Sequence, residues 1–335
     1  MTNRKDDHIT QALHQNSLSN DFDRVRFVPE ALARLNTKTI DTSRILFGRT
    51  FDSPVYINAM SGGSERSLVM NTKLAKLAAA LNIPMASGSV SAAIKDPRWE
   101  ESFTVIREHH PNGFVLANVG LSQTLEGAKK AIKLLKADAL QVHLNAAQEI
   151  VMPEGDRDFS DWPQRLQTMV EQLDVPVIVK EVGFGLSRES LAFLSALGVQ
   201  YVDVSGRGGT NFITIENARR RYPLDHFDDY GFSTVESLLE GKDSDLTLLA
   251  SGGVRGAFDV VKAIALGAKM VGMSGFFLKM VHELSLEECI EKTQQLLQDI
   301  RMIMAILNVS NLDELAAKPL LLDASLQHFL SQRSR

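Results

Sequence analysis

Eight short apolar runs, each about as long as one β-strand, recur along the chain and limit what it can fold into. Most are followed by a segment with helical spacing, and they cover residues 54–60, 83–89, 113–120, 138–144, 175–183, 200–206, 246–253 and 269–275. Most are nearly continuous in apolar residues rather than alternating, which is typical of parallel strands buried on both faces. The sequence therefore predicts a parallel sheet whose strands are joined by helices.

The segments between these runs carry the spacing of helices. Apolar residues in 74–81 recur at i, i+3, i+4 and i+7, and 125–135 and 191–197 repeat the pattern, with Ser187 placed as an N-cap. Eight consecutive βα units predict an α/β fold, the (β/α)8 TIM barrel, closed so that no sheet edge remains. A doubly wound open sheet is the alternative, but the chain has no second composition zone.

A length of 335 residues suits one barrel domain with additions. We expect 1–335 to be a single domain, with 1–50 as an N-terminal extension and 207–245 as an insertion between strands six and seven. The insertion is too long for one crossover helix, and its aromatic and charged residues suit a loop over the active face. Residues 285–310 predict a long helix, and the tail from Ser331 is expected to fray.

Charge, apolar run length and cysteine content exclude several classes of protein. A net charge of −5 argues against nucleic-acid binding, because no overall positive field attracts phosphates. No apolar run approaches the roughly 20 residues that span a bilayer, and the charged N-terminus lacks the apolar region of a signal peptide. The single cysteine, Cys289, cannot form a disulfide within the chain. We therefore expect a soluble, cytoplasmic protein with neither nucleic acid nor membrane as partner.

Glycine-rich turns follow the seventh and eighth strands, in "SGGVRG" and "MSG". In a barrel these turns commonly bind phosphate through backbone N–H groups and the N-terminus of the next helix. Each motif alone is more often a simple tight turn, but both occur at the strands where barrels bind phosphate, which reverses that preference. The pair, with Gly252, Gly253 and Gly275, predicts a phosphate site.

Lys180 ends the apolar run "VIVK", at the rim of the barrel interior. A lysine there is costly unless it meets an anion or a carboxylate. It could form an ion pair with Glu181 or Glu149, act as a Schiff-base nucleophile as in an aldolase, or place a cation beside an electron-rich cofactor ring.

The loop after strand four, "QVHLNAAQE", gathers His143, Asn145, Gln148 and Glu149. One carboxylate with amides beside it can hold Mg2+, which commonly uses one or two carboxylates together with substrate phosphates. A polar loop with a helix cap is the alternative interpretation.

These motifs together resemble the type 2 isopentenyl-diphosphate isomerase family. The likeness extends from residue 4 to about residue 280 through "RKDDHI", "PVYINAMSGGS", "LANVG", "QVHLNAAQE", "VPVIVKEVGFG", "DVSGRGGTNF" and "SGGVRGAFDVVKAIALGA". The combination of "RKDDHI" with "HLNAAQE" is the specific part, whereas "SGGVR" is shared by many FMN barrels. Members are FMN-dependent (β/α)8 enzymes that interconvert isopentenyl and dimethylallyl diphosphate by a 1,3-proton shift.

The resemblance implies a role for each matching residue. Those expected to contact FMN are Met60, Ser61, Gly62, Ser89, Asn118, Lys180, Ser205, Thr210, Gly252, Gly253, Arg255, Ser274 and Gly275. Those expected to hold the diphosphate substrate are Arg4, Lys5, His8, Ser89, His143, Asn145 and Gln148. Glu149 would bind Mg2+, and the catalytic residues would be Lys180, Gln148 and His143.

The family also implies reduced FMN as the acid and base, with NADPH as a reductant that is not consumed stoichiometrically, and a homo-oligomer (tetramer or octamer). Lys180 would stabilise the anionic reduced flavin. Arg4 and Lys5, with Mg2+, would neutralise the diphosphate, so we expect a terminus that is mobile until substrate binds.

Other functions of barrels that bind FMN or use a catalytic lysine fit this sequence less well. An FMN-dependent 2-hydroxy-acid oxidase or dehydrogenase, the main alternative, needs a histidine base in the strand-six loop, where Arg207 stands. A dehydrogenase of the inosine monophosphate type needs a loop cysteine, yet Cys289 falls in a late helical segment. An aldolase using Lys180 and a non-catalytic flavin-storage barrel remain as further alternatives.

Overall fold

Eight parallel strands form a closed barrel in the computed structural model, which describes residues 4–15 and 20–334. Each strand lies within a predicted run: β4 (Val55–Ile57), β5 (Met85–Ala86), β6 (Val115–Gly120), β7 (Ala139–Leu144), β8 (Val177–Glu181), β9 (Tyr201–Asp203), β10 (Thr247–Leu249) and β11 (Val271–Met273). The sheet runs β10-β9-β8-β7-β6-β5-β4-β11, and a parallel bridge between Ala250 and Val271 joins its two ends. The predicted TIM barrel is confirmed.

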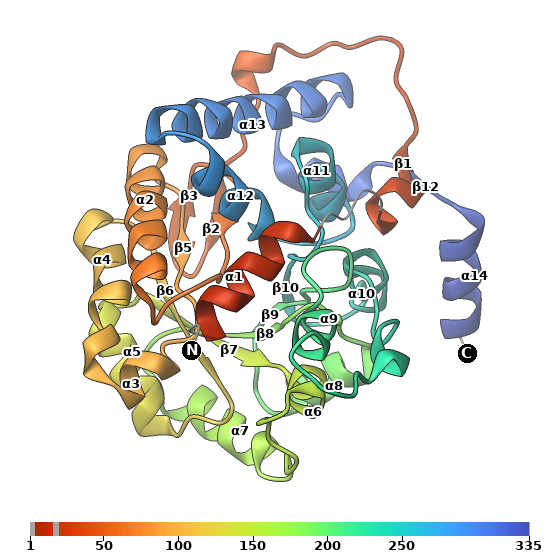
Figure 1. The fold of residues 1–335 in the computed structure, drawn as a ribbon. Coiled ribbons are helices and arrows are strands. Elements are labelled where there is room, and N and C mark those ends of the chain that lie inside the picture. The colour runs from red at the N-terminus through yellow and green to blue at the C-terminus, as the bar shows by residue number, and fades with distance from the viewer. Residues whose placement is uncertain (1–3, 16–19, 335) are drawn as a thin grey trace.

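Helices surround the barrel (Figure 1). Those following strands β4 to β8 are α2 (Glu65–Leu81), α3 (Ser91–Lys95), α4 (Glu101–His109), α5 (Leu125–Leu135), α6 (Ala146–Val151), α7 (Trp162–Gln172) and α8 (Arg188–Ala196). Those following β10 and β11 are α11 (Ala257–Ala265), α12 (Gly275–Glu283) and α13 (Leu286–Ile306), the predicted long helix. The predicted cap also forms, since the Ser187 side chain accepts a bond from the Ser190 N–H.

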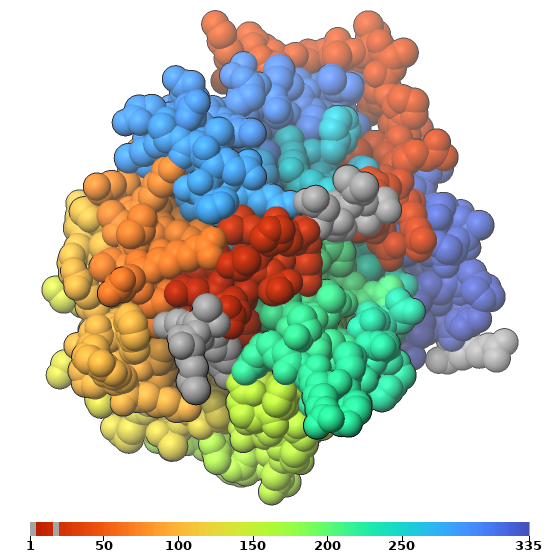
Figure 2. Space-filling model, viewed as in Figure 1, coloured from red at the N-terminus to blue at the C-terminus, as the bar shows by residue number. Residues whose placement is uncertain are grey.

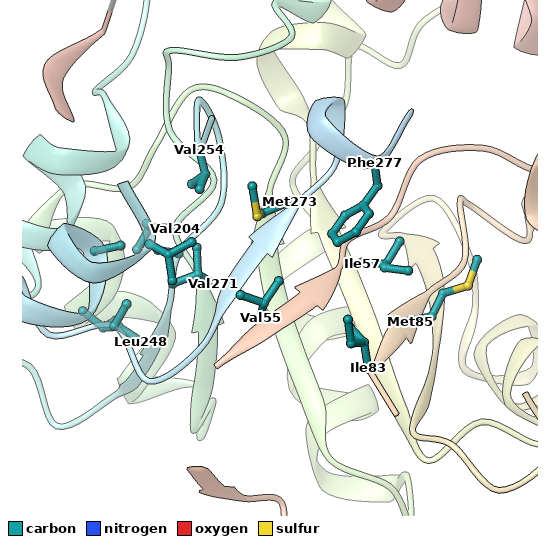
Figure 3. Close-up of a cluster of buried hydrophobic side chains, with 14 of the residues drawn as sticks. Val55, Ile57, Ile83, Met85, Val204, Leu248, Val254, Val271, Met273 and Phe277 are labelled. Atoms are coloured by element: carbon teal, nitrogen blue, oxygen red, sulfur yellow. The ribbon is translucent and has the colours of Figure 1, made fainter. Parts of the chain in front are cut away.

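The core lies between the barrel and its helices. Figure 3 shows where β4, β5 and β11 meet, with Val55, Ile57, Met85 and Met273 close together and Phe277 of α12 beside Ile57. All five of these side chains are buried. Burial on both faces explains why the strands appear in the sequence as continuous apolar runs.

The N-terminal extension wraps the barrel rather than forming a solvated tail. Helix α1 (Arg4–His14) crosses the centre of the face in Figures 1 and 2 and contacts α2, α9 and α12. Its Ile9 is buried, and Asp6 accepts a hydrogen bond of 2.6 Å from the Ser64 hydroxyl. The terminus therefore has core contacts, because this short helix has an apolar side chain to bury and side-chain bonds of its own. That it is mobile until substrate binds stays a prediction.

The rest of the extension contacts the C-terminal strand β12 (Leu320–Leu322) and the amino-terminal end of the barrel. After η1 (Asp21–Arg24), strand β1 (Val25–Phe27) pairs with β12, and η2 (Thr37–Thr39) follows. The hairpin β2 (Arg44–Leu46) and β3 (Arg49–Phe51) then packs Phe51 against Phe114, which precedes β6. Since Phe114 lies before its strand, the hairpin covers the amino-terminal end of the barrel.

The segment after β9 contains the barrel helix α10 (Thr234–Glu240) and, before it, the additional helices α9 (Phe212–Asn217) and η4 (Asp225–Phe227). Helix α10 begins with a capping box formed by Ser233 and Glu236. Helix α9 packs against α6 at the carboxyl-terminal ends of the strands.

The C-terminal tail is anchored, contrary to the expectation that it frays. After η5 (Leu312–Ala317), helix α14 (Ala324–Arg333) places Arg333 between Glu189 and the fully buried side chain of Glu240. Arg333 reaches Glu240 with two bonds of 2.7 and 3.0 Å. Among the residues described, every helix is too short or too polar to cross a bilayer.

We expect Arg333→Gln to lower the free energy of unfolding by about 1–3 kcal/mol, because the buried Glu240 carboxylate would lose two charged donors. Gln332→Ala, an exposed change on the same helix, is the control. The measurement is urea unfolding of both variants beside the unmodified protein. Equal midpoints for the two variants would show that the tail does not stabilise the fold.

Candidate active site

A cavity of about 1260 Å³ opens at the carboxyl ends of the strands, with α1 on one side of it. The residues predicted to bind ligands come together in its wall, although they are spread over most of the chain. Those lining it are Lys5, His8, Met60, Ser61, Ser89, Asn118, His143, Asn145, Gln148, Glu149, Lys180, Ser205, Thr210, Gly252, Gly253, Arg255, Ser274 and Gly275.

Two predicted residues fall outside that set. Gly62 does not line the cavity, and a Cβ at this position would lie 2.1 Å from the ring of Phe103 in α4. The absence of a side chain therefore lets α4 pack closely here, and the predicted contact of Gly62 with FMN stays a prediction. The side chain of Arg4 lies outside the described part of the structure, so its predicted role stays a prediction.

The glycine turns after β9 and β10 pack directly on one another. Gly252 and Gly253 have φ of +93° and +74°, which favours glycine. A Cβ on Gly252 would lie 2.1 Å from the carbonyl oxygen of Gly206, and one on Gly253 would lie 2.7 Å from that of Gly208. These glycines are therefore required by backbone packing as well as by any ligand.

Gly275, after β11, differs because it faces open space. Apart from its chain neighbours and the backbone of its own helix, no described atom lies within 4 Å of the position a Cβ would take. It is the first residue of α12, whose N-cap Ser274 makes no side-chain capping bond with the described residues. Unpaired N–H groups at a helix N-terminus attract anions, so this wall of the cavity suits a phosphate.

An unpartnered hydroxyl marks the wall beside β4. The Oγ of Ser61 is buried and has no hydrogen-bond partner among residues 4–15 and 20–334. Buried polar atoms are rarely left unpaired, since doing so costs about 1–3 kcal/mol. A ligand group in the cavity would satisfy it.

Lys180 is held at the floor of the cavity by neutral oxygens. Its Nζ donates to the Ser205 hydroxyl at 3.1 Å and to the Glu181 carbonyl at 2.6 Å. The Glu181 carboxylate instead accepts the backbone N–H groups of residues 182–184. Burial lowers the pKa of Lys180, and the charges of Asp203 and Glu181 oppose that shift. Both hydrogen bonds of the Lys180 Nζ to the described residues therefore end on neutral oxygens rather than on a carboxylate.

His143 occupies the same level of the barrel, since β7 aligns it with Lys180 of β8. Its Nδ1 lies 2.7 Å from the Asn118 side-chain oxygen. Burial, with the charges of Lys180 and Lys5, lowers the pKa of this histidine to about 3. The ring is therefore neutral at physiological pH.

Glu149, the predicted metal ligand, lies on α6 with one amide beside it. Its carboxylate accepts from Asn145 at 2.8 Å and from the backbone N–H of Asp156 at 2.9 Å. Within the described residues no group of three or more His, Cys, Asp or Glu side chains is placed to hold a metal. A cation here would depend on oxygens from a ligand.

Glu216, which the sequence did not indicate, contacts two residues of the cavity wall. From α9 it accepts a bond from Gln148 at 3.1 Å and lies 3.0 Å from the His8 ring nitrogen of α1. Although burial raises its pKa, His8, Gln148 and the ion pair with Arg219 together outweigh that effect and hold the pKa at about 2. No spacing in the insertion indicated this carboxylate, because only the fold brings α1, α6 and α9 together.

Arg255 lines the cavity but already has two carboxylate partners. It bonds Asp23 at 2.6 Å and Asp259 at 2.9 Å. The N-terminal extension also reaches the glycine turn directly, since the Asn20 amide donates to the Gly253 carbonyl at 2.7 Å. Arg255 therefore braces the turn against the extension, a role that the sequence analysis did not foresee.

Comparison with known proteins decides the family. Residues 6–100 and 102–322 match the family described as FMN-dependent dehydrogenase. An isopentenyl-diphosphate delta-isomerase of Latilactobacillus sakei is 47% identical over 99% of this chain and 96% of its own length. The isopentenyl-diphosphate delta-isomerase of Staphylococcus saprophyticus is 45% identical over 98% of this chain and 96% of its own length. The chain belongs to the isopentenyl-diphosphate delta-isomerase family.

Solved structures support the fold of this isopentenyl-diphosphate delta-isomerase family member. A flavocytochrome b2 variant with sulfite bound has a TM-score of 0.68 at 22% identity, covering 96% of this chain and 81% of the other. A mandelate oxidase variant with (S)-mandelic acid has a TM-score of 0.63 at 16% identity, covering 97% and 95%. Arg207, where an oxidase would need its histidine base, bonds the Asp229 carbonyl and does not line the cavity.

Neutral His143 stabilises the fold, and we expect this stabilisation to be lost as the pH is lowered. Its folded pKa of about 3 lies below the ordinary 6.5, so the contribution is present above pH 6.5 and is lost as the pH falls toward 3. Between roughly pH 8 and pH 5, unfolding free energy should drop by up to about 2 kcal/mol more in the unmodified protein than in His143→Gln. Denaturant unfolding of both at the two pH values measures this, and parallel losses would contradict a neutral His143.

Proposed function

We propose that this protein interconverts isopentenyl diphosphate and dimethylallyl diphosphate by a 1,3-proton shift, using reduced FMN and Mg2+. The observation that carries the proposal is that one cavity joins an anion-binding glycine wall to the polar loop after β7, in a chain 47% identical to a named isomerase. The reaction adds one proton and removes another, so it involves no net oxidation.

The residues present fit a flavin nucleotide. Gly275 and the uncapped start of α12 leave room and N–H groups for a phosphate. The unpartnered Ser61 hydroxyl and the Lys180 ammonium lie on the walls where polar ring atoms would be accommodated. We propose Met60, Ser89, Asn118, Ser205, Thr210, Gly252, Gly253 and Ser274 as further contacts, with Arg255 acting through the turn it braces.

When bound, reduced FMN would supply the acid–base chemistry that an unactivated alkene requires. The chain itself provides the charge environment. Lys180 keeps a positive charge at the floor of the cavity, where it would stabilise an anionic ring. His143 is neutral. Helix α1 lines the cavity through Lys5, His8, Ile9 and Ala12.

The diphosphate would bind between α1 and the loop after β7. Lys5 and His8 line the cavity from the helix, and Asn145, Gln148 and Glu149 line it from the segment after β7. A single carboxylate with an adjacent amide suits Mg2+ shared with phosphate oxygens. Ser89 lines the same cavity, and we propose Arg4 as the second basic residue on α1.

NADPH as the reductant, a homo-oligomeric assembly and a cytoplasmic location complete the proposal. The bacterial relatives are consistent with it. An FMN-dependent 2-hydroxy-acid oxidase is the alternative, but the position of Arg207 offers no base to the cavity.

The function is tested by supplying the purified protein with FMN, Mg2+ and NADPH under anaerobic conditions, then adding isopentenyl diphosphate. We expect dimethylallyl diphosphate to accumulate with far less than one NADPH oxidised per product, because the reaction is redox-neutral. Product is quantified by NMR and NADPH by absorbance. Stoichiometric loss of NADPH would indicate a reductase, and oxygen uptake with 2-hydroxy acids would indicate an oxidase.

The phosphate wall is tested by Gly275→Asp, which adds a carboxylate in open space at the start of α12. We expect FMN binding to weaken about tenfold or more, because like charge would face the phosphate. Gly256→Asp is the control, since Gly256 also has open space around it but does not line the cavity. Flavin fluorescence titration measures both, and unchanged affinity in Gly275→Asp would place the phosphate elsewhere.

The metal site is tested by Glu149→Gln. We expect most activity and its dependence on Mg2+ to disappear while flavin stays bound, because a neutral amide is a poor ligand for Mg2+. Asp158→Asn, on an exposed carboxylate at the cavity edge, should keep the Mg2+ dependence. If Mg2+ titrations of Glu149→Gln match those of the unmodified enzyme, Glu149 does not bind the metal.

A further inference from the structure

A row of polar side chains crosses the barrel interior and ends in the wall of the cavity. It starts at Asp203, the last residue of β9, and ends at His143 of β7. Between them lie three amides, Asn58, Gln141 and Asn118, which we call the amide relay. Asp203 and all three amides are buried. Buried polar groups are costly unless paired, so the direction of each hydrogen bond in the row matters.

Asp203 fixes the direction at one end. It accepts from the Tyr56 hydroxyl at 2.7 Å, the Ser251 hydroxyl at 2.7 Å and the backbone N–H of Ser205 at 3.1 Å. An ionised carboxylate only accepts hydrogen bonds, so Asn58 turns its NH2 group toward it, at 2.8 Å.

A second contact fixes the same amide independently. The side-chain oxygen of Asn58 accepts the backbone N–H of Ala59 at 2.8 Å. A backbone N–H can only donate, so this bond would be lost if the amide were reversed. The orientation of Asn58 therefore does not depend on the carboxylate alone.

The direction then passes along the relay. Gln141 donates its NH2 group to the Asn58 oxygen at 3.0 Å, which leaves its own oxygen to accept from the Asn118 NH2 group at 3.1 Å. The Asn118 oxygen must then face His143, whose Nδ1 lies 2.7 Å away. An oxygen cannot donate, so Nδ1 carries the proton.

We propose that Asp203 is a positioning residue that, through the amide relay, holds His143 in the Nδ1–H tautomer with an unprotonated Nε2 toward the cavity. Nε2 lies against Gly120, where a Cβ would approach it within 2.7 Å. Lys180 of the next strand and Lys5 of α1 are the cations that act on the ring. Their charges disfavour a second proton.

The tautomer determines which ligand group His143 can meet. An unprotonated Nε2 accepts, so its partner in the cavity must be an N–H or O–H donor. An ionised diphosphate offers only acceptors, which argues against His143 as a diphosphate ligand. The N–H groups of a reduced flavin ring are donors, and this last assignment alone rests on the proposed function.

The tautomer can be read by NMR from the full-length holoenzyme labelled with nitrogen-15 in its histidines. The couplings between ring nitrogens and ring protons distinguish the two neutral tautomers, and His143→Gln identifies the signals by their loss. We expect His143 to be Nδ1–H in the unmodified enzyme at neutral pH. An Nε2–H signal there would overturn the proposal.

The relay is tested by cutting it at Gln141. Gln141→Leu removes the acceptor for Asn118 and should give a mixture of tautomers, whereas Gln141→Glu retains an acceptor oxygen and should restore Nδ1–H. Ser251→Ala, which removes one donor to Asp203 without touching the relay, should leave the tautomer unchanged. A pure Nδ1–H signal in Gln141→Leu would refute the relay.

If Gln141→Leu fails to fold by circular dichroism, Asn118→Leu decides instead, because it removes the direct partner of Nδ1. The isomerase assay on the same preparations separates the two proposals. An Nδ1–H tautomer without isomerase activity would leave the relay intact and refute the function. Isomerase activity with an Nε2–H tautomer would do the reverse.

Discussion

Closure of the sheet through Ala250 is the constraint on which the rest of the molecule depends. The bridge from Ala250 to Val271 joins β10 to β11, so both ends of the eight-stranded sheet are hydrogen-bonded. Closure places the carboxyl ends of all eight strands, which follow one another between residues 57 and 273, at one rim. It also encloses a buried interior. There Lys180 has a lowered pKa, and His143 stays neutral.

Much of the fold and of the cavity could be predicted because both follow from local patterns combined with closure. Strands buried on both faces appear as continuous apolar runs, and a closed barrel places whatever follows each strand at a common rim. The positions of Lys180, Glu149 and Gly275 follow from that rule without knowledge of any contact. The resemblance to a known family added the roles of residues on α1, which no spacing specifies.

Contacts between distant segments could not be predicted. Glu216 lies in an insertion without periodicity, and its importance appears only when α9 meets His8 and Gln148. Asp203 lies within an apparently apolar strand, where a single polar residue looks like an interruption. Gly62 resembles a ligand-binding glycine in sequence, and its close packing against Phe103 appears only in the fold. In each case the deciding partner is remote along the chain.

The contacts of the N-terminal extension have a consequence for folding on the ribosome. Asn20 bonds the Gly253 carbonyl, 233 residues further along the chain, and Val25 pairs with Leu322 of β12. Asn20 and Val25 thus find these partners only after residues 253 and 322 have been synthesised. Such distant pairings make loop closure entropically costly and slow. The glycine turn after β10 therefore gains its brace from Asn20 only once the first seven strands of the barrel have been synthesised.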